Sequence, residues 1–198
     1  LMDAQERYIL LFDRTRSLSL HLFEHVHGES RDRGQAMVDL IKVYEDGGYS
    51  PTTAELPDFL PLFLEYASTL SPTQAIELIG QPSHVFGALR ERLKKRGSVY
   101  EAVFAALIQL SQAELDEDMI VRLLAEPDPE PDDLEALDAA WAEEEVLFGP
   151  GAAADSYVPR IVADLNAARP FDIALIDGIE TVAGGEGPWI RGIRRVTP

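Results

Sequence analysis

Apolar side chains recur at intervals of three and four residues from Asp3 to Gly48, and this periodicity predicts three amphipathic helices. Asp3 can cap the first helix, the polar run 13–17 separates it from the second, and glycines are natural stops for the second and third, at Gly28 and at Gly47–Gly48. The positions that we expect to face the core are Tyr8, Leu11, Phe12 and Thr15, then Leu18, Leu22, Phe23 and Val26, then Met37, Leu40, Ile41 and Tyr44.

Proline and glycine divide the next stretch into further helices. The pattern places Pro57 in the first turn of a helix, where proline is tolerated. Pro72 follows a serine at the start of a short helix. A third helix opens at Pro82 or Ser83 and ends at Gly97, after a basic run that suits the helix dipole. The inward positions that this pattern predicts are Leu60, Phe63, Leu64 and Ala67 in the first of these helices and Val85, Phe86, Leu89 and Leu93 in the third.

The run 98–111, SVYEAVFAALIQLS, is apolar nearly all the way round. A helix of this kind is buried on every side in most globular proteins. We therefore expect Ser98 to cap it and the rest of the chain to pack on it as the central helix. A further helix over 116–125 follows.

The pattern changes after residue 125. The segment 126–133, EPDPEPDD, predicts an acidic, proline-rich linker, and 134–148 predicts one more amphipathic helix. Beyond it, the alternating run 171–176 could pair as a strand, but an isolated strand cannot bury itself. We expect an all-α, single-domain helical bundle over 1–148, without the native opening helices of such a domain, and a flexible tail over 149–198 that is partly helical or disordered.

The charge of the chain is strongly acidic. The formal net charge is −18 over 198 residues, with 35 acidic and 17 basic side chains. Such a charge disfavours nucleic acid and anionic membrane surfaces as partners and favours a cationic one. The absence of cysteine excludes disulfides and thiolate ligands and fits a cytoplasmic protein. No apolar run approaches the roughly 20 residues of a membrane span, so we expect no stable membrane insertion.

His21, Glu24 and His25 form an H-x-x-E-H pattern, which in some zinc proteases places two imidazoles on one helical face. Such a site needs a third ligand, and no later stretch supplies a recognisable one. A polar network around the turn at Gly28 is the favoured interpretation, and the alternatives are a salt-bridged helix junction and one wall of a groove. We therefore expect no metal site and no catalytic residues.

Two motifs carry a family resemblance. Residues 23–40, FEHVHGESRDRGQAMVDL, and 54–66, AELPDFLPLFLEY, closely resemble the NarJ family, the assembly chaperones of membrane-bound respiratory nitrate reductase, within the TorD-like group of redox-enzyme maturation chaperones. Tyr8, Leu11 and Phe12 match the Y-x-x-L-F of that group. Glu55, Pro57 and Asp58 match its E-x-P-D-H, with Phe59 in place of the histidine.

The resemblance implies a TorD-like chaperone without catalysis or a cofactor of its own. It would bind the N-terminal segment of the nitrate reductase catalytic subunit, keep it competent for molybdenum cofactor insertion, delay membrane attachment and be absent from the finished enzyme. We expect a monomer or dimer whose peptide-binding site comprises Tyr8, Leu11, Phe12, Glu24, His25, Glu29, Glu55, Pro57 and Asp58. The alternative is an acidic helical adaptor for another basic peptide, its own tail included, or for a different molybdoenzyme client.

Overall fold

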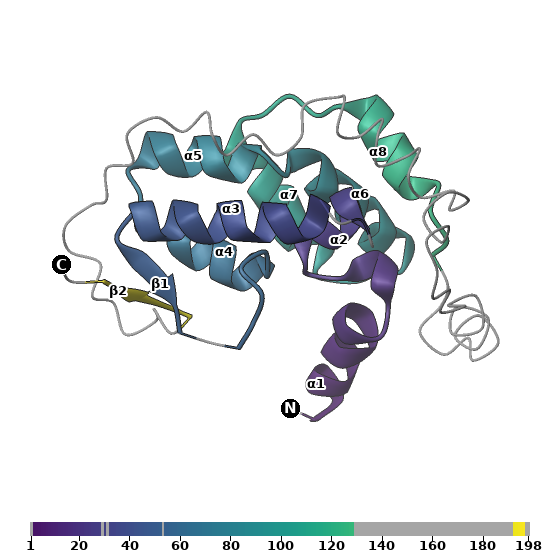
Figure 1. The fold of residues 1–198 in the computed structure, drawn as a ribbon. Coiled ribbons are helices and arrows are strands. Elements are labelled where there is room, and N and C mark those ends of the chain that lie inside the picture. The colour runs from purple at the N-terminus through teal and green to yellow at the C-terminus, as the bar shows by residue number, and fades with distance from the viewer. Residues whose placement is uncertain (1, 29, 31, 53, 129–191, 197–198) are drawn as a thin grey trace, which may run out of the picture.

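The computed structural model describes residues 2–28, 30, 32–52, 54–128 and 192–196. Helices pack on one another over most of this length, and a two-stranded ribbon lies at one end of the bundle (Figure 1). The elements in chain order are α1 (Met2–Tyr8), the π-helix η1 (Ile9–Asp13), the 3-10 helix η2 (Arg16–Leu18), α2 (Leu22–His27), α3 (Asp32–Asp46), β1 (Tyr49–Pro51), α4 (Leu60–Ala67), α5 (Pro72–Gly80), α6 (Ser83–Lys95), α7 (Glu101–Ser111), α8 (Glu117–Leu124) and β2 (Ile193–Arg195). The predicted all-α class is confirmed.

Helix ends follow the local signals in most places. Gly28, Gly48 and Gly97 take positive φ angles of 51°, 81° and 61°, a region that glycine enters without a Cβ clash. At the start of α8, the Asp116 carboxylate accepts a hydrogen bond from the Met119 N–H at 3.0 Å, which satisfies one of the free amides of the first turn.

The centre of the bundle is α6, not the run 98–111 that the sequence pattern predicts. Val85, Phe86, Leu89 and Leu93 of α6 are completely buried, and α6 packs against α7, α8, η2 and α2. The all-round apolar helix, α7, begins only at Glu101 and buries one face against α5 and α6. Its other face leaves three aliphatic side chains 50–77% exposed: Val99 just before the helix, Val103 and Leu110.

The prediction for Pro57 is also wrong. Pro57 lies in a turn before α4, which begins at Leu60 and carries Pro61 in its first turn. The Pro57 carbonyl accepts a hydrogen bond from the Tyr44 hydroxyl at 2.7 Å, so this turn is anchored to α3. In the part of the chain that the structure describes, no helix is long and apolar enough to cross a membrane.

Candidate functional site

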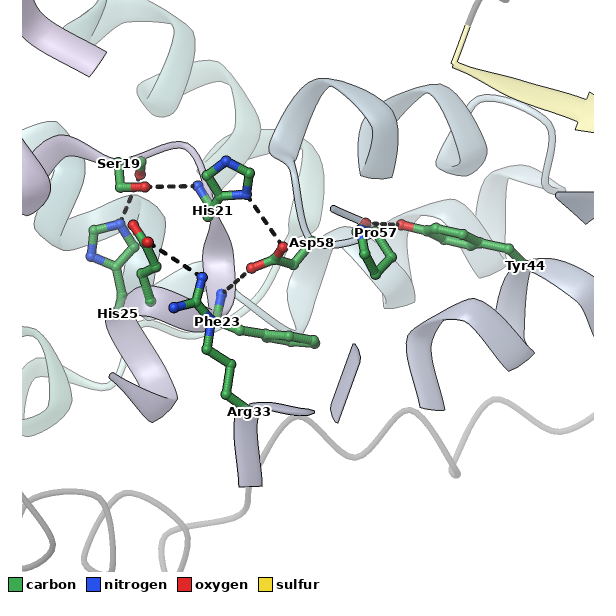
Figure 2. Close-up of polar contacts among 9 residues, drawn as sticks. Ser19, His21, Phe23, His25, Arg33, Tyr44, Pro57 and Asp58 are labelled. Atoms are coloured by element: carbon green, nitrogen blue, oxygen red, sulfur yellow. Dashed lines mark hydrogen bonds and ion pairs between the residues drawn. The ribbon is translucent and has the colours of Figure 1, made fainter. Parts of the chain in front are cut away.

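Asp58 organises the junction between α2 and α4. It is completely buried, and its Oδ2 accepts a hydrogen bond from the Phe23 N–H at 3.0 Å (Figure 2). Its backbone carbonyl accepts a second from the Leu22 N–H at 3.1 Å. The first amides of a helix have no partner inside it, and the N-cap residue of α2, His21, makes no side-chain cap. Asp58 thus caps a helix that lies more than thirty residues before it.

The histidines of the H-x-x-E-H pattern face different partners. His21 Nδ1 donates to Asp58 Oδ1 at 3.3 Å, and this hydrogen bond raises the pKa of His21 against the opposing effect of its partial burial. His25 is buried and donates from Nε2 to the Ser19 carbonyl at 2.8 Å; a carbonyl only accepts, so this nitrogen carries the proton. Burial lowers the pKa of His25.

Glu24 completes this network without forming a metal site. Its Oε1 lies 3.3 Å from Arg33 Nη2 on α3, so the carboxylate pairs with a guanidinium (Figure 2). Across the described residues, no three His, Cys, Asp or Glu side chains gather as metal ligands. The favoured interpretation, a polar network at the helix junction, agrees with this geometry. Glu29, which we expect in the peptide-binding site, lies outside the described residues.

Tyr8 and Phe12 form an aromatic cluster with Tyr100, which precedes α7. Ring centroids are 5.0 Å apart for Tyr8 and Phe12 and 5.1 Å apart for Phe12 and Tyr100. Leu11 and Phe12 are buried and belong to the core, whereas Tyr8 is half-buried. Tyr100 belongs to no motif, and only the tertiary contact of its ring with those of Tyr8 and Phe12 brings the three together.

Exposed apolar side chains follow Tyr8 in η1 and occur in the loop that carries Glu55. Ile9 and Leu10 are 45% and 38% exposed, and Leu56, beside the exposed Glu55, is 44% exposed. Burial raises the pKa of Tyr8, and the nearby charges of Asp13 and Glu55 raise it further. We call Tyr8, Ile9, Leu10, Glu55 and Leu56 the Tyr8 surface.

A second buried polar centre was missed by the sequence analysis. Arg92 of α6 is 2% exposed and donates from Nη1 to the Ser17 carbonyl at 2.7 Å and from Nη2 to the Leu123 carbonyl at 2.6 Å. One side chain thus joins η2 to the end of α8. From the sequence, an arginine at the basic end of a predicted helix is expected at the surface, because the apolar pattern gives no information on the backbone carbonyls that surround it in the fold.

Asp128 extends this polar centre to the acidic segment 126–133. Arg96 donates to both of its carboxylate oxygens, at 2.7 and 2.8 Å, and the Ser17 hydroxyl donates to Oδ1. Partial burial by itself raises the pKa of Asp128, but these hydrogen bonds and the charges of Arg96 and Arg92 outweigh it and lower the pKa. The first residues of the predicted linker are therefore bound to the helical body.

Comparison with known proteins gives the family. Residues 1–106 match the sequence profile described as nitrate reductase delta subunit. The chain belongs to the nitrate reductase delta subunit family. The motifs at Tyr8–Phe12 and Glu55–Asp58 both fall inside the matched range, so the family resemblance that they predicted is confirmed.

Individual relatives extend the similarity beyond residue 106. The chain is 46% identical over 147 residues to the nitrate reductase molybdenum cofactor assembly chaperone NarJ of Escherichia coli strain K12, which covers 74% of this chain and 62% of that protein. It is 46% identical over 148 residues to the probable chaperone of the same description, NarW, from that strain, covering 75% and 64%. The probable chaperone NarJ of Bacillus subtilis strain 168 is 32% identical over 103 residues, covering 52% and 56%. The chain spans less than two thirds of the length of these relatives.

The histidines of this family member predict a loss of stability in acid. Burial lowers the pKa of His25, His27 and His84 below the ordinary value of 6.5. Below pH 6.5 the unfolded chain binds protons that the folded chain does not, so stability falls with pH, by up to about 1.4 kcal/mol per pH unit for each such histidine. His21 has a raised pKa and acts in the opposite direction, since its stabilisation is complete below pH 6.5 and is lost as pH rises through its folded pKa. Because three histidines have a lowered pKa and one has a raised pKa, we expect acid to lower the stability of the protein.

The measurement is urea denaturation between pH 7 and pH 5. We expect the free energy of unfolding to fall over this range, and to fall less in a His25→Gln variant, whose amide can still donate to Ser19. His21→Gln is the matched control and should make the fall steeper. Equal pH dependence of the His25→Gln variant and the parent would contradict the assignment of His25 as a buried neutral group.

Proposed function

We propose that this chain is an assembly chaperone for a nitrate reductase. It binds the N-terminal segment of the catalytic subunit, keeps that subunit competent for molybdenum cofactor insertion and delays its attachment to the membrane. The observation that carries the proposal is the 46% identity over 147 residues to a nitrate reductase molybdenum cofactor assembly chaperone. In this proposal the protein is cytoplasmic, has no catalysis or cofactor of its own and is absent from the finished enzyme.

The Tyr8 surface is the proposed peptide-binding site. It combines exposed aliphatic side chains and the half-buried Tyr8 with the Glu55 carboxylate, on a chain of net charge −18. An amphipathic helix can lay its apolar face on such a surface and place its basic residues against the carboxylate. Charge then steers the encounter, while burial of apolar surface supplies most of the affinity.

The other expected site residues divide by burial. Leu11 and Phe12 lie beneath the Tyr8 surface as its apolar floor, and Pro57, Asp58 and His25 are buried among backbone partners. We assign the last three the role of organisers, because a side chain without exposed surface cannot meet a peptide. Glu24 is paired with Arg33 at the rim of the same junction. Glu29 remains a proposed contact by sequence alone.

Calorimetric titration tests the proposal. The ligand is a synthetic peptide of the first few dozen residues of the nitrate reductase catalytic subunit from the same genome. We expect saturable one-to-one binding with a dissociation constant on the order of micromolar or below. Absence of binding to this peptide, together with binding of another basic peptide, would favour the alternative of an acidic adaptor or a different molybdoenzyme client.

A substitution at Glu55 probes the electrostatic part. Glu55→Gln removes an exposed charge, and exposed ion pairs contribute about 0.2–1 kcal/mol, so we expect affinity to fall by a factor of about 1.4 to 5 at low salt. The difference should shrink as salt rises, because screening removes it. Glu77→Gln, which removes an exposed carboxylate from α5, is the matched control and should change neither quantity. An unchanged affinity and salt dependence for Glu55→Gln would remove Glu55 from the site.

A further inference from the structure

The segment 192–196 is held on the helical body as an added strand. β2 pairs antiparallel with β1 in a register that places Tyr49 opposite Arg195, Ser50 opposite Arg194 and Pro51 opposite Ile193. Just outside this register, the Thr52 N–H donates to the Gly192 carbonyl at 2.8 Å and the Val196 N–H donates to the Gly48 carbonyl at 2.7 Å. Main-chain hydrogen bonds thus fix both ends of the segment. Figure 1 shows the ribbon at the end of the bundle, below α3.

The helical body makes specific contacts with two positions of this segment. The Gly192 N–H donates to both carboxylate oxygens of Glu65 on α4, at 3.0 and 2.8 Å. A Cβ at position 192 would lie 2.6 Å from Glu65 Oε2 and 3.4 Å from Leu62 Cδ1, so a side chain there would displace the carboxylate that binds the Gly192 N–H. Ile193 is 4% exposed and packs into the hydrophobic core.

The remaining residues of the segment face solvent. Arg194, Arg195 and Val196 are exposed, and β1 follows directly after the acidic end of α3, Glu45 and Asp46. The segment therefore presents a simple pattern: glycine, a buried aliphatic residue, then two exposed basic residues. Opposite charges of this kind favour the basic strand on a chain that is acidic as a whole.

The receiving edge is built by the helices. Tyr49 of β1 is 6% exposed and packs edge-on against Tyr66 of α4, with ring centroids 6.1 Å apart. The Tyr66 hydroxyl donates to the Val43 carbonyl of α3 at 3.0 Å, and Glu65 is the residue before it on α4. α3 and α4 thus carry the hydrogen-bonding edge and the carboxylate of this site.

We propose that β1, Glu65 and Leu62 form a strand-addition site for extended protein segments in which a glycine precedes an aliphatic residue and basic residues. Residues 192–196 are its intramolecular ligand, and a second polypeptide of the same chemistry displaces them. In strand addition, main-chain bonds supply affinity and alternate side chains supply specificity, as Gly192 and Ile193 do here.

Exchange is feasible because the segment buries little. Ile193 is the buried aliphatic side chain of the segment, and the other contacts that hold it are main-chain hydrogen bonds that another extended segment can also form. The intramolecular tie compensates by setting a high local concentration of the segment. This site is separate from the Tyr8 surface and does not depend on the proposed function.

Peptide binding in trans tests the proposal. The probe is a dye-labelled peptide of residues 189–198, WIRGIRRVTP, followed by fluorescence anisotropy. The receptors are the full chain and the full chain with Gly192→Val and Ile193→Asp, which prevent its own segment from docking. We expect the variant to bind the probe at least tenfold more tightly than the unaltered chain, because its site is vacant. Adding Glu65→Ala to the variant should abolish this gain.

A matched probe carries the same two changes, Gly192→Val and Ile193→Asp, and keeps all its arginines. We expect it not to bind. Equal binding of both probes would reduce the interaction to charge alone and overturn the proposal, as would failure of the variant to bind either one. Equal affinity of the two receptors for the first probe would show that residues 192–196 of the unaltered chain do not compete with the probe for this site, and would also overturn the proposal. The helical circular dichroism of each variant, which these strand positions should not alter, confirms that the receptors are folded.

A designed disulfide shows which copy supplies the strand. The chain contains no cysteine, so Ser50→Cys with Arg194→Cys introduces a single pair at directly opposed positions, within reach of a disulfide. We expect an internal crosslink in the monomer. Ser50→Cys with Arg195→Cys is the control, because adjacent residues of a strand point to opposite faces. Crosslinking only between two chains would overturn the intramolecular assignment.

Discussion

Replacing Arg92 with alanine is expected to lower the free energy of unfolding by about 3–5 kcal/mol. The change leaves the Ser17 and Leu123 carbonyls without their donor in a buried site and opens a cavity where the side chain stood. Burial lowers the pKa of Arg92 against the favourable charges of Asp128 and Glu126, but the guanidinium remains charged. The main cost of the substitution is therefore that two buried carbonyls lose the charged donor of their hydrogen bonds. Urea denaturation measures the effect as a shift of the midpoint at constant slope.

Two comparisons make this result specific. Arg92→Met keeps most of the side-chain volume and removes the buried charge, so it should cost about half as much as Arg92→Ala. Arg90→Ala removes an arginine from the same helix whose partner is the partly exposed Glu101, and it should cost less than about 1 kcal/mol. If Arg92→Ala were no more destabilising than Arg90→Ala, Arg92 would not be the link between η2 and α8.

Asp58→Ala is expected to lower the free energy of unfolding by about 2–4 kcal/mol. The change removes the charged acceptor of the Phe23 N–H and the partner of His21, in a place that water does not reach. Asp58→Asn keeps one oxygen for the Phe23 amide and should cost about 1 kcal/mol. Chemical denaturation with circular dichroism at 222 nm measures all of these values.

Glu55→Ala is the matched control for Asp58→Ala, three residues away in the same loop. Because Glu55 is exposed, its removal should change stability by no more than about 0.5 kcal/mol. The two substitutions are then expected to have different effects: loss of the Glu55 carboxylate alters the proposed peptide affinity, and loss of the Asp58 carboxylate alters folding stability. Full stability of the Asp58→Ala protein would contradict the capping role.

The helix starts and stops could be predicted because they depend on residues close together in sequence. Gly28, Gly48 and Gly97 take the left-handed conformations that their positions predicted, and α5, α6 and α8 begin within one residue of the expected starts. The error at α7 has a different origin. Apolar residues on every side show that a helix can be buried, but they do not show which neighbours cover it, and here α5 and α6 cover only one face.

The candidate site was predicted in part for the same reason. The E-x-P-D motif identified Asp58 as important and placed it in the proposed peptide-binding site, whereas in the structure it caps a helix. The helix that it caps, α2, could not be predicted, since the two are joined only by tertiary contact. The same holds for Tyr100 beside Tyr8, and for Arg92, whose two carbonyl partners come from η2 and α8.

The sequence by itself therefore determined the helical class, most helix boundaries, the acidic charge and the family motifs, because each depends on local spacing or on composition. The tertiary structure alone decided that α6 is the central helix, that Asp58 caps α2, that Arg92 joins η2 to α8 and that residues 192–196 pair with β1. These arrangements join segments far apart in the chain, and their stability comes from buried hydrogen bonds and packing that form only when the whole bundle closes around them.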